Sequence, residues 1–361
     1  MGQFAFIIHP ISVAADVARK YRIARYLPEP WVEWGIKYMS PKLLSQITGV
    51  RSLTGATCEG WFVGCPLTPR QFLHLDEKFV ISKIVKAGQM AQQLGAKVVG
   101  LGAYTSVVGD QGVSVARELD IAVTTGNSYT VATAVQGVLK AGELMGVQAP
   151  SATAAVVGAA GSIGRVCAQM LSRKVARLLL VGLDDAPLRK VADELPGKAE
   201  VQVTTDAGPA LRQSDLVVTV TSAVDAVIEP DDLKPGSVVC DVARPRDVSK
   251  QVADQRQDVL VIEGGVVAIP GEVEFNFNFG FPPRTSYACM AETMILALEN
   301  RYENFSLGRE LSEDKVAEIA ALADKHGFTL AGFRSFEKAV TDDQIARTRE
   351  AAERAKAPPE V

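Results

Sequence analysis

The chain is poor in the residue types that build metal sites and disulfide frameworks. Its 361 residues include three histidines, and these form no HExxH or similar arrangement. The five cysteines are odd in number, scattered and without metal-ligand spacing. We therefore predict no metal site, and this cysteine usage predicts a reducing, cytoplasmic environment. The residues concerned are His9, His74, His326, Cys58, Cys65, Cys167, Cys240 and Cys289.

Two further features are absent, and each argues against a class of partner. No uncharged apolar stretch reaches about 18 residues, so no integral membrane segment is expected. The net charge is −4, the pI is about 5.6 and no long basic block occurs, which argues against a nucleic-acid partner. The opening MGQFAFIIHP has no basic region before its apolar run, so it predicts a strand rather than a signal peptide.

The stretch AAVVGAAGSIG at residues 154–164 is the most informative in the chain. Its first residues, 154–157, predict a buried strand, and the apolar spacing after the glycines predicts a helix. Gly158 permits a tight turn, Gly161 lets a pyrophosphate approach the backbone, and Gly164 lets the helix pack against the strand. This phosphate cradle predicts a nicotinamide dinucleotide, the alternative being a glycine turn in another α/β unit. The candidate cofactor-binding residues in this loop are Gly158, Ala160, Gly161, Ser162, Ile163 and Gly164.

Polar residues also follow two later strands of this unit. Asp184 comes after a strand predicted over 178–181 and about 20 residues after the last glycine, where such folds bind the ribose hydroxyls. Thr221 and Ser222 follow the fourth predicted strand, on the side where a nicotinamide usually lies. We take all three as candidate cofactor-binding residues.

Strands and helices alternate along the chain, which predicts an α/β fold with two domains. Residues 1–148 predict a parallel α/β substrate domain, in which apolar and aromatic positions recur at helical spacing over residues 30–50. Residues 149–280 predict a Rossmann-type, doubly wound parallel sheet of six strands. Residues 281–361 predict a C-terminal helical segment that packs back on the first domain.

Three shorter segments have their own signals. The stretch EVEFNFNFGFPPRT at 272–285 is rich in phenylalanine and asparagine and contains two prolines, so it predicts a loop before a new helix. Near the N-terminus a helix is predicted over residues 13–25. The closing AKAPPEV predicts a frayed tail.

Cys289, in RTSYACMAETM, is the candidate nucleophile. Thr285 or Ser286 is predicted to cap a helix, which places Cys289 in the first turn with Arg284 nearby. A helix N-terminus and a neighbouring cation both favour thiolate over thiol. The alternative is a small buried residue, the commonest state of a free cysteine. Cys65, at the end of a predicted strand, is a second candidate.

Two polar loops follow strands of the first domain, where ligands bind in parallel sheets. They are LGAYTS at 101–106 and TTGNSYT at 124–130. Their polar groups are placed to hydrogen-bond a substrate, although polar residues after a strand also commonly cap the next helix. The candidate substrate-binding residues are Tyr104, Thr105, Ser106, Thr125, Asn127 and Ser128.

Together these segments resemble the long-chain acyl-[acyl-carrier-protein] reductase family of cyanobacteria, nearly end to end. The similar strings are FAFIIHPIS, LGAYTS, TTGNSYT, VVGAAGSIG, EGGVVAIP, SYACMAETM, NFSLGRE and KHGF. The resemblance implies that a fatty acyl thioester is reduced to a fatty aldehyde with NADPH. It implies Cys289 as the active-site cysteine, and Lys78 and Lys83 match family lysines. It also implies an acyl carrier protein or coenzyme A thioester as substrate and an aldehyde-consuming enzyme as partner.

One stretch departs from the family pattern. Where the family has a T-A-R-N type sequence whose arginine can grip the 2′-phosphate of NADPH, this chain has Val181-Gly182-Leu183-Asp184. Leu183 replaces the arginine, and the carboxylate of Asp184 repels a phosphate and accepts hydrogen bonds from a free ribose. The residues therefore favour NADH, whereas the resemblance implies NADPH.

These observations predict an NAD(P)H-dependent acyl-thioester reductase. The Cys289 thiolate attacks the thioester, and the resulting acyl-enzyme accepts a hydride. Lys78, Asn127 and Ser222 complete the predicted catalytic set, and the candidate oxyanion donors are Asn127, Thr105 and Ser222. Two alternatives stay open: a shikimate-dehydrogenase-like alcohol oxidoreductase with a lysine base, and a non-catalytic NAD(H)-binding sensor. Neither alternative needs the cysteine.

Overall fold

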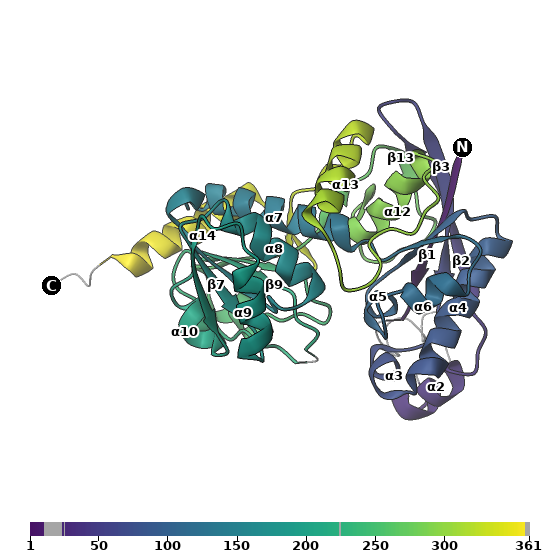
Figure 1. The fold of residues 1–361 in the computed structure, drawn as a ribbon, viewed down its shortest axis with the longest axis horizontal. Coiled ribbons are helices and arrows are strands. Elements are labelled where there is room, and N and C mark those ends of the chain that lie inside the picture. Colours follow the sequence, from purple (N-terminus) through teal and green to yellow (C-terminus); the bar gives the residue numbers. More distant parts are fainter. Residues whose placement is uncertain (11–23, 25, 224, 358–361) are drawn as a thin grey trace. The chain divides into compact units, whose positions relative to one another are not determined.

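The computed structural model describes residues 1–10, 24, 26–223 and 225–357, and the chain groups into two compact units (Figure 1). Apart from Ala24, the helix predicted over residues 13–25 lies outside the described residues, as do the last four residues of the predicted tail. The domain limits predicted above stay a prediction. The first unit comprises Met1–Asn127, Ala268–Glu310 and Ile319–Thr329, and the second comprises Ser128–Val267, Leu311–Glu318 and Leu330–Val361.

A six-stranded sheet with the order β13-β2-β3-β1-β4-β5 forms the centre of the first unit. Strands β3, β1, β4 and β5 are parallel, whereas β2 is antiparallel to β3 and β13 is antiparallel to β2. The prediction of a wholly parallel domain was therefore wrong at this side of the sheet. The strands are β1 (Gly2–Ile8), β2 (Lys42–Arg51), β3 (Thr57–Gly64), β4 (Val98–Leu101), β5 (Ala122–Thr124) and β13 (Gly271–Glu274).

The helical spacing over residues 30–50 was misleading. The helix α2 ends at Ile36 (Glu29–Ile36), and the second half of the segment is strand β2. Leu43, Ile47 and Val50 follow one another at helical spacing, but the register of β2 against β3 shifts between Leu43 and Ser45 and again between Ile47 and Val50. Such irregularities break the period-two alternation of a strand. The resulting apolar pattern imitates a helix.

Helix α12 (Ala288–Leu298), light green in Figure 1, covers one face of the first unit's sheet. A Cβ atom at Gly2 would overlap the carbonyl oxygen of Ala297, and one at Gly100 would overlap Oγ1 of Thr293. The helix backbone therefore lies directly against β1, and the side chain of Thr293 lies against β4. Because its last turn meets the beginning of β1, its first turn lies towards the carboxyl ends of the parallel strands. The opposite face packs against α4 (Glu77–Gln93).

The second unit contains a six-stranded parallel sheet with the order β11-β10-β9-β6-β7-β8. Counted from β6, this is the 3-2-1-4-5-6 order of doubly wound dinucleotide-binding folds, with the direction of winding reversed between β6 and β9. The predicted fold class is confirmed. The strands are β6 (Thr153–Val157), β7 (Arg177–Val181), β8 (Glu200–Thr204), β9 (Leu216–Thr219), β10 (Val238–Asp241) and β11 (Leu260–Glu263).

The remaining described elements are mostly short. The helices of the second unit are α7 (Asn127–Leu144), α8 (Ser162–Ser172), α9 (Asp185–Asp193), α10 (Ala207–Leu211), α11 (Lys250–Gln255) and α14 (Asp342–Lys356). The first residue of α7, Asn127, belongs to the first unit. The first unit contains α3 (Pro69–His74), α5 (Tyr104–Val107), α6 (Val113–Arg117) and β14 (Thr285–Tyr287). The others are η3 (Ala149–Ser151), η4 (Pro230–Asp232), β12 (Val266–Ala268), α13 (Glu313–His326), β15 (Thr329–Leu330), β16 (Phe333–Ser335) and β17 (Lys338–Val340).

Candidate functional site

Cys289 differs from the other four cysteines because it alone is not buried. Burial raises the pKa of the Cys65 and Cys167 thiols to about 12, and in Cys65 the nearby charge of Lys83 opposes this only in part. Burial also raises the pKa of Cys58 and Cys240. These four groups are protonated thiols near neutral pH, so they are poor nucleophiles. The structure therefore favours Cys289 over Cys65.

The first turn of α12 carries Cys289, but the predicted cap was wrong. Thr285 and Ser286 belong to strand β14, and the residue that precedes the helix is Tyr287. The hydroxyl of Thr285 donates to the carbonyl of Pro282 (2.8 Å), and that of Ser286 to the carbonyl of Tyr287 (3.1 Å). No side chain caps α12. The positive end of the helix dipole therefore lies at the turn that carries Cys289.

Arg284, the cation expected beside Cys289, forms an ion pair with Glu272. Both side chains are exposed. The prediction that Arg284 stabilises the thiolate loses its support, because this charge is already compensated. The helix N-terminus is the feature that favours a thiolate at Cys289.

Gly126 brings the TTGNSYT loop against the nucleophile. Its φ is +74°, and a Cβ atom at this position would overlap the Cα and Cβ atoms of Cys289. The backbone that follows β5 therefore lies directly on the first turn of α12. This contact places Cys289 at the carboxyl end of a parallel strand, where α/β folds bind their ligands. The half-buried Asn127 follows immediately.

Three of the predicted substrate-binding hydroxyls are used within the fold. Thr105 and Ser106 each donate to the carbonyl three residues earlier (2.8 and 2.7 Å), and Thr125 donates to the carbonyl of Ser306. All three side chains are buried, as is Ser128. These bonds hold the two loops in shape, and the three hydroxyls donate to carbonyls rather than cap a helix.

Tyr104 is different, because its hydroxyl is buried and has no hydrogen-bond partner among the described residues. Burial raises the pKa of this phenol, which keeps it a neutral donor. Its ring lies 5.7 Å from that of His9, which follows β1, and 6.0 Å from that of Phe72. A buried unpartnered donor at the carboxyl ends of β1 and β4 is a candidate contact for a bound ligand. Sequence reasoning missed His9, although its position directly after a strand was a usable signal.

The two lysines of α4 lie in different environments. Lys78 is exposed in the first turn of the helix, which matches a solvated charge. Lys83 is buried, and its Nζ donates to the carbonyl of Met39 (2.9 Å). Burial, followed by the charge of Lys86, lowers the pKa of Lys83. Of the two, Lys83 therefore has the environment typical of a functional amine.

In the second unit the glycine loop has the geometry that a dinucleotide requires. Gly158 has a φ of +83°, and a Cβ atom on Gly164 would overlap the carbonyl oxygen of Gly158. A Cβ atom on Gly161 would meet a single neighbour, the same oxygen at 3.2 Å. The space in front of Gly161 is therefore open to a ligand, and the residues present fit a pyrophosphate. Around this glycine, Ala160 is exposed, and Ser162 and Ile163 are half-buried.

Asp247, which sequence reasoning missed, holds the loop after β9. Its fully buried carboxylate accepts hydrogen bonds from the backbone N–H and the hydroxyl of Thr221 (2.9 and 2.5 Å) and from the hydroxyl of Thr219 (2.5 Å). Thr221 therefore shapes the loop through its side chain. Ser222 is exposed on the same loop. Asp241 lies close by, and burial raises its pKa to about 6.

The residues after β7 leave a carboxylate exposed to solvent. Asp184 precedes α9 without capping it, and Leu183 is 96% exposed. Arg189, a cation one turn further on, is already paired with Asp185. The loop after β7 thus exposes a carboxylate and an apolar side chain, and the exposed Lys190 lies beside Arg189 in α9.

Replacing Gly161 by valine tests the cradle. Its φ of −74° suits any residue, and the side chain would fill the space in front of the loop. The contact of 3.2 Å between the new Cβ atom and the carbonyl oxygen of Gly158 requires a shift of a few tenths of an ångström, so thermal unfolding is measured alongside. We expect the affinity for the dinucleotide to fall at least about tenfold, or roughly 1.4 kcal/mol. Fluorescence titration with NADH and NADPH measures it. Gly35→Val, at a glycine with open space in α2, is the matched control. Unchanged affinity in Gly161→Val would place the cofactor elsewhere.

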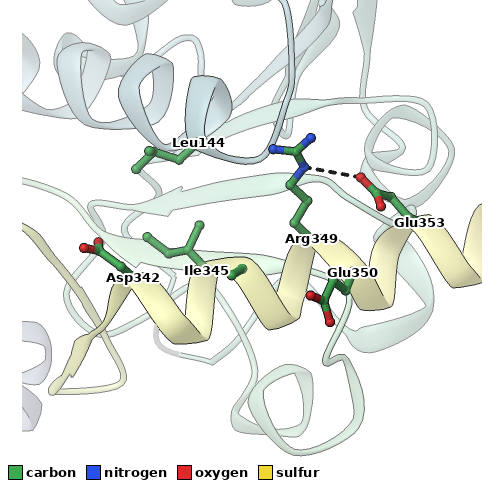
Figure 2. A pocket seen from close by; sticks show the side chains of 7 residues that line it. Leu144, Asp342, Ile345, Arg349, Glu350 and Glu353 are labelled. Atoms are coloured by element: carbon green, nitrogen blue, oxygen red, sulfur yellow. Dashed lines mark hydrogen bonds and ion pairs between the residues drawn. The ribbon is translucent and has the colours of Figure 1, made fainter.

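A pocket of about 430 Å³ lies between the end of α7 and helix α14, and none of its lining residues is a predicted site residue (Figure 2). Its only cation, Arg349, is paired with Glu353 (3.3 Å). The lining residues are Leu144, Asp342, Ile345, Ala346, Arg349, Glu350 and Glu353. In the described part of the chain, no three His, Cys, Asp or Glu residues cluster as metal ligands, and no helix is long and apolar enough to cross a membrane.

Comparisons with known proteins connect the chain to oxidoreductases. The Shikimate / quinate 5-dehydrogenase family model matches residues 141–263. Long-chain acyl-[acyl-carrier-protein] reductase of Synechococcus elongatus is 29% identical, over 90% of this chain and 98% of its own length. Together with the strand order and the glycine loop, these matches support an NAD(P)-dependent reductase.

The chain is also similar to part of an aminotransferase and to a solved reductase structure. Aminotransferase PigE of a Serratia species is 32% identical over 95% of this chain, which spans only 41% of that protein. Among solved structures, glutamyl-tRNA reductase from Methanopyrus kandleri shares 19% identity and has a TM-score of 0.31, with 76% of this chain and 55% of that chain covered.

Proposed function

We propose that the chain reduces a fatty acyl thioester to a fatty aldehyde through an acyl-enzyme on Cys289. The observation that carries this proposal is the position of Cys289. It is the one cysteine that is not buried, it lies in the uncapped first turn of α12, and Gly126 fixes it at the carboxyl end of β5. The similarity to an acyl-[acyl-carrier-protein] reductase over nearly the full length of both chains supports it. We place the reaction in the cytoplasm, with an acyl carrier protein or coenzyme A thioester as substrate and an aldehyde-consuming enzyme downstream.

The chemistry follows from the residue types. The thiolate attacks the thioester carbonyl, a C–S bond to Cys289 forms, and the carrier thiol leaves with a proton. A bound reduced nicotinamide supplies the hydride that converts the acyl group to the aldehyde level. Loss of the aldehyde then returns the thiol to Cys289. The positive end of the α12 dipole and the neutral phenol of Tyr104 are the groups that we propose to stabilise the developing oxyanion.

The second unit provides the place for the dinucleotide. Gly158, Gly161 and Gly164 would hold its pyrophosphate, and Asp184 would accept hydrogen bonds from the adenosine ribose. The test of the proposed function is direct: purified protein, reduced nicotinamide and hexadecanoyl-coenzyme A or hexadecanoyl carrier protein should yield hexadecanal. Oxidation of the nicotinamide without aldehyde would overturn the proposed function.

Cofactor preference should follow the residues after β7. A 2′-phosphate would meet the exposed carboxylate of Asp184, while Leu183 offers no donor and Arg189 is already paired with Asp185. A like-charge contact of this kind costs on the order of 1–4 kcal/mol at short range. We therefore expect kcat/KM to favour NADH over NADPH at least about tenfold. Asp184→Asn should reduce the ratio of kcat/KM with NADH to kcat/KM with NADPH, and Leu183→Arg should raise kcat/KM with NADPH.

The same comparison of kcat/KM with NADH and NADPH can contradict the proposed NADH preference. Suppose the wild-type enzyme strongly prefers NADPH and Asp184→Asn changes neither kcat/KM value. Asp184 then does not face the ribose, and the proposed NADH preference is wrong.

A dehydrogenase that acts on an alcohol is the second candidate. It is favoured by the match to the shikimate and quinate dehydrogenase family model and by the buried Lys83, whose lowered pKa suits a base. Such an enzyme needs no cysteine. Loss of aldehyde formation in a Cys289 variant, with cofactor binding intact, separates the two functions.

A further inference from the structure

Helix α2 and the turn that ends it present large aromatic side chains to solvent. Trp31, Trp34 and Tyr38 stand three and four residues apart, so they lie on one face of the helix. Their exposed fractions are 70%, 64% and 62%. The rings of Trp34 and Tyr38 contact each other, with centroids 5.4 Å apart. We call these three side chains the aromatic face.

The core of the first unit does not need the aromatic face. On another side of α2, Val32 and Ile36 are buried and pack with Ala24 and the half-buried Met39 in a small apolar cluster. The helix therefore already has its inner contact. Two of the chain's three tryptophans are nevertheless exposed on this short helix. An exposed apolar surface of this kind marks an interaction site.

A hollow of about 280 Å³ borders the aromatic face, between α2 and α3 (Figure 1). The side-chain amide of Gln71 in α3 donates to the carbonyl of Glu33 in α2 (2.7 Å), which holds the two helices together. The hollow is lined by a tryptophan ring of the aromatic face and by the basic side chains of Lys37, Arg70 and His74. We call it the cationic hollow.

Positive charge prevails in the cationic hollow. Glu33 is the one carboxylate among its lining residues, and it already accepts a hydrogen bond from the hydroxyl of Thr68 (2.7 Å). The ammonium of Lys37 lies 5.0 Å from the centre of the Tyr38 ring, so the basic groups and the aromatic face form one surface. This local charge is opposite in sign to the net charge of −4 of the whole chain.

We propose that the aromatic face and the cationic hollow attach the protein to the surface of an anionic membrane. Tryptophan and tyrosine side chains are amphipathic and accumulate at the level of the lipid headgroups. Basic side chains beside them attract the phosphate groups of anionic headgroups. The attachment is peripheral, because α2 has 8 residues and a spanning helix needs about 20. This inference needs neither the thioester nor the dinucleotide.

A lipid surface fits these residues better than an acidic protein does. Tyr26 and Leu27, shortly before α2, are exposed as well. The apolar side chains therefore project from one short stretch of chain and stand next to basic groups, which is the composition of segments that lie in a membrane interface. A carrier protein and a second copy of the chain are the alternative occupants, and the experiments below distinguish them.

Sedimentation with lipid vesicles tests the attachment. Wild-type protein should bind vesicles made of equal parts of phosphatidylcholine and phosphatidylglycerol more tightly than vesicles of phosphatidylcholine alone. The double variant Trp31→Ser/Trp34→Ser should bind both at least about tenfold more weakly. Leu53→Ser is the matched control, because Leu53 is an exposed apolar residue elsewhere in the first unit. It should bind as the wild type does.

The basic side chains are tested separately. The double variant Lys37→Gln/Arg70→Gln should bind the vesicles with phosphatidylglycerol about tenfold more weakly and bind pure phosphatidylcholine within about twofold of the wild type. Lys198→Gln, at an exposed lysine of the second unit, is its control and should change neither value. Equal losses on both kinds of vesicle would overturn the role of the cationic hollow.

A measurement on wild-type protein alone guards against variants that fail to fold. Brominated phosphatidylcholine in the vesicles should quench the tryptophan emission of the bound protein, because Trp31 and Trp34 would lie at the headgroups. Bound protein without quenching would overturn the proposal. So would wild-type protein that binds neither kind of vesicle, or a folded Trp31→Ser/Trp34→Ser variant that binds as tightly as the wild type.

The alternative occupants give results of their own, and each would also overturn the proposal. Suppose that wild-type protein binds no vesicles but is a dimer, and that Trp31→Ser/Trp34→Ser is a monomer. The aromatic face then joins two copies of the chain. Suppose instead that it binds no vesicles and that the double variant lowers kcat/KM for a hexadecanoyl carrier protein but not for hexadecanoyl-coenzyme A. The face then docks the carrier protein.

Discussion

Replacing Cys289 by serine should abolish aldehyde formation. A serine hydroxyl is far less acidic than a thiol, and the helix N-terminus of α12 cannot ionise it at neutral pH. We expect kcat/KM to fall by at least about a thousandfold while dinucleotide affinity stays within about twofold, because the glycine loop belongs to the second unit. Aldehyde production and fluorescence titration of the reduced nicotinamide measure the two quantities.

The other cysteines provide the controls. Cys167→Ser and Cys240→Ser introduce a hydroxyl into fully buried positions, so they should cost stability through burial of a polar group and leave the chemistry intact. Cys65→Ser tests the second candidate nucleophile in the same way. Near-normal turnover of Cys289→Ser, or complete loss of turnover in a folded Cys65→Ser variant, would contradict the assignment of Cys289.

Replacing Gly126 by alanine should damage both the fold and the site. The added methyl group would overlap the backbone of Cys289, which cannot move without shifting the start of α12. We expect the free energy of unfolding of the first unit to fall by more than about 4 kcal/mol, and residual activity to be lost. Thermal unfolding and aldehyde production are the measurements.

Gly55→Ala is the matched control for Gly126→Ala. Gly55 has a similar φ of +86°, but a Cβ atom there would meet nothing within 4 Å. It should therefore show the cost of the left-handed backbone alone, on the order of 1–2 kcal/mol, with normal activity. Equal destabilisation in the two variants would mean that the contact between Gly126 and Cys289 is unimportant.

Sequence reasoning succeeded where the signal is local. The strand, glycine loop and helix around residues 154–172 follow one another directly, so the pattern predicts the element order that the structure shows. The same holds for Cys289, whose place in the first helical turn needed only the neighbouring residues. Strand β2 failed for a local reason too, because its register shifts give the apolar residues a helical spacing.

The features that sequence reasoning missed depend on contacts between distant residues. Asp247 binds Thr221 across 26 positions, and nothing near Asp247 indicates that partner. Gly126 meets Cys289 more than 160 positions along the chain, so the pattern showed a turn but not its neighbour. The ion pair of Arg284 with Glu272 was missed for the same reason, because its partner lies in a neighbouring segment.

The most direct test of the central claim is to trap the acyl-enzyme. Wild-type protein is incubated with hexadecanoyl-coenzyme A in the absence of reduced nicotinamide, and the products are examined by intact-protein and peptide mass spectrometry. The account predicts one hexadecanoyl group per chain, on the peptide that contains Cys289, and its release as hexadecanal when reduced nicotinamide is added. An enzyme that forms aldehyde but carries no acyl group, or carries it on another residue, would contradict the proposed mechanism.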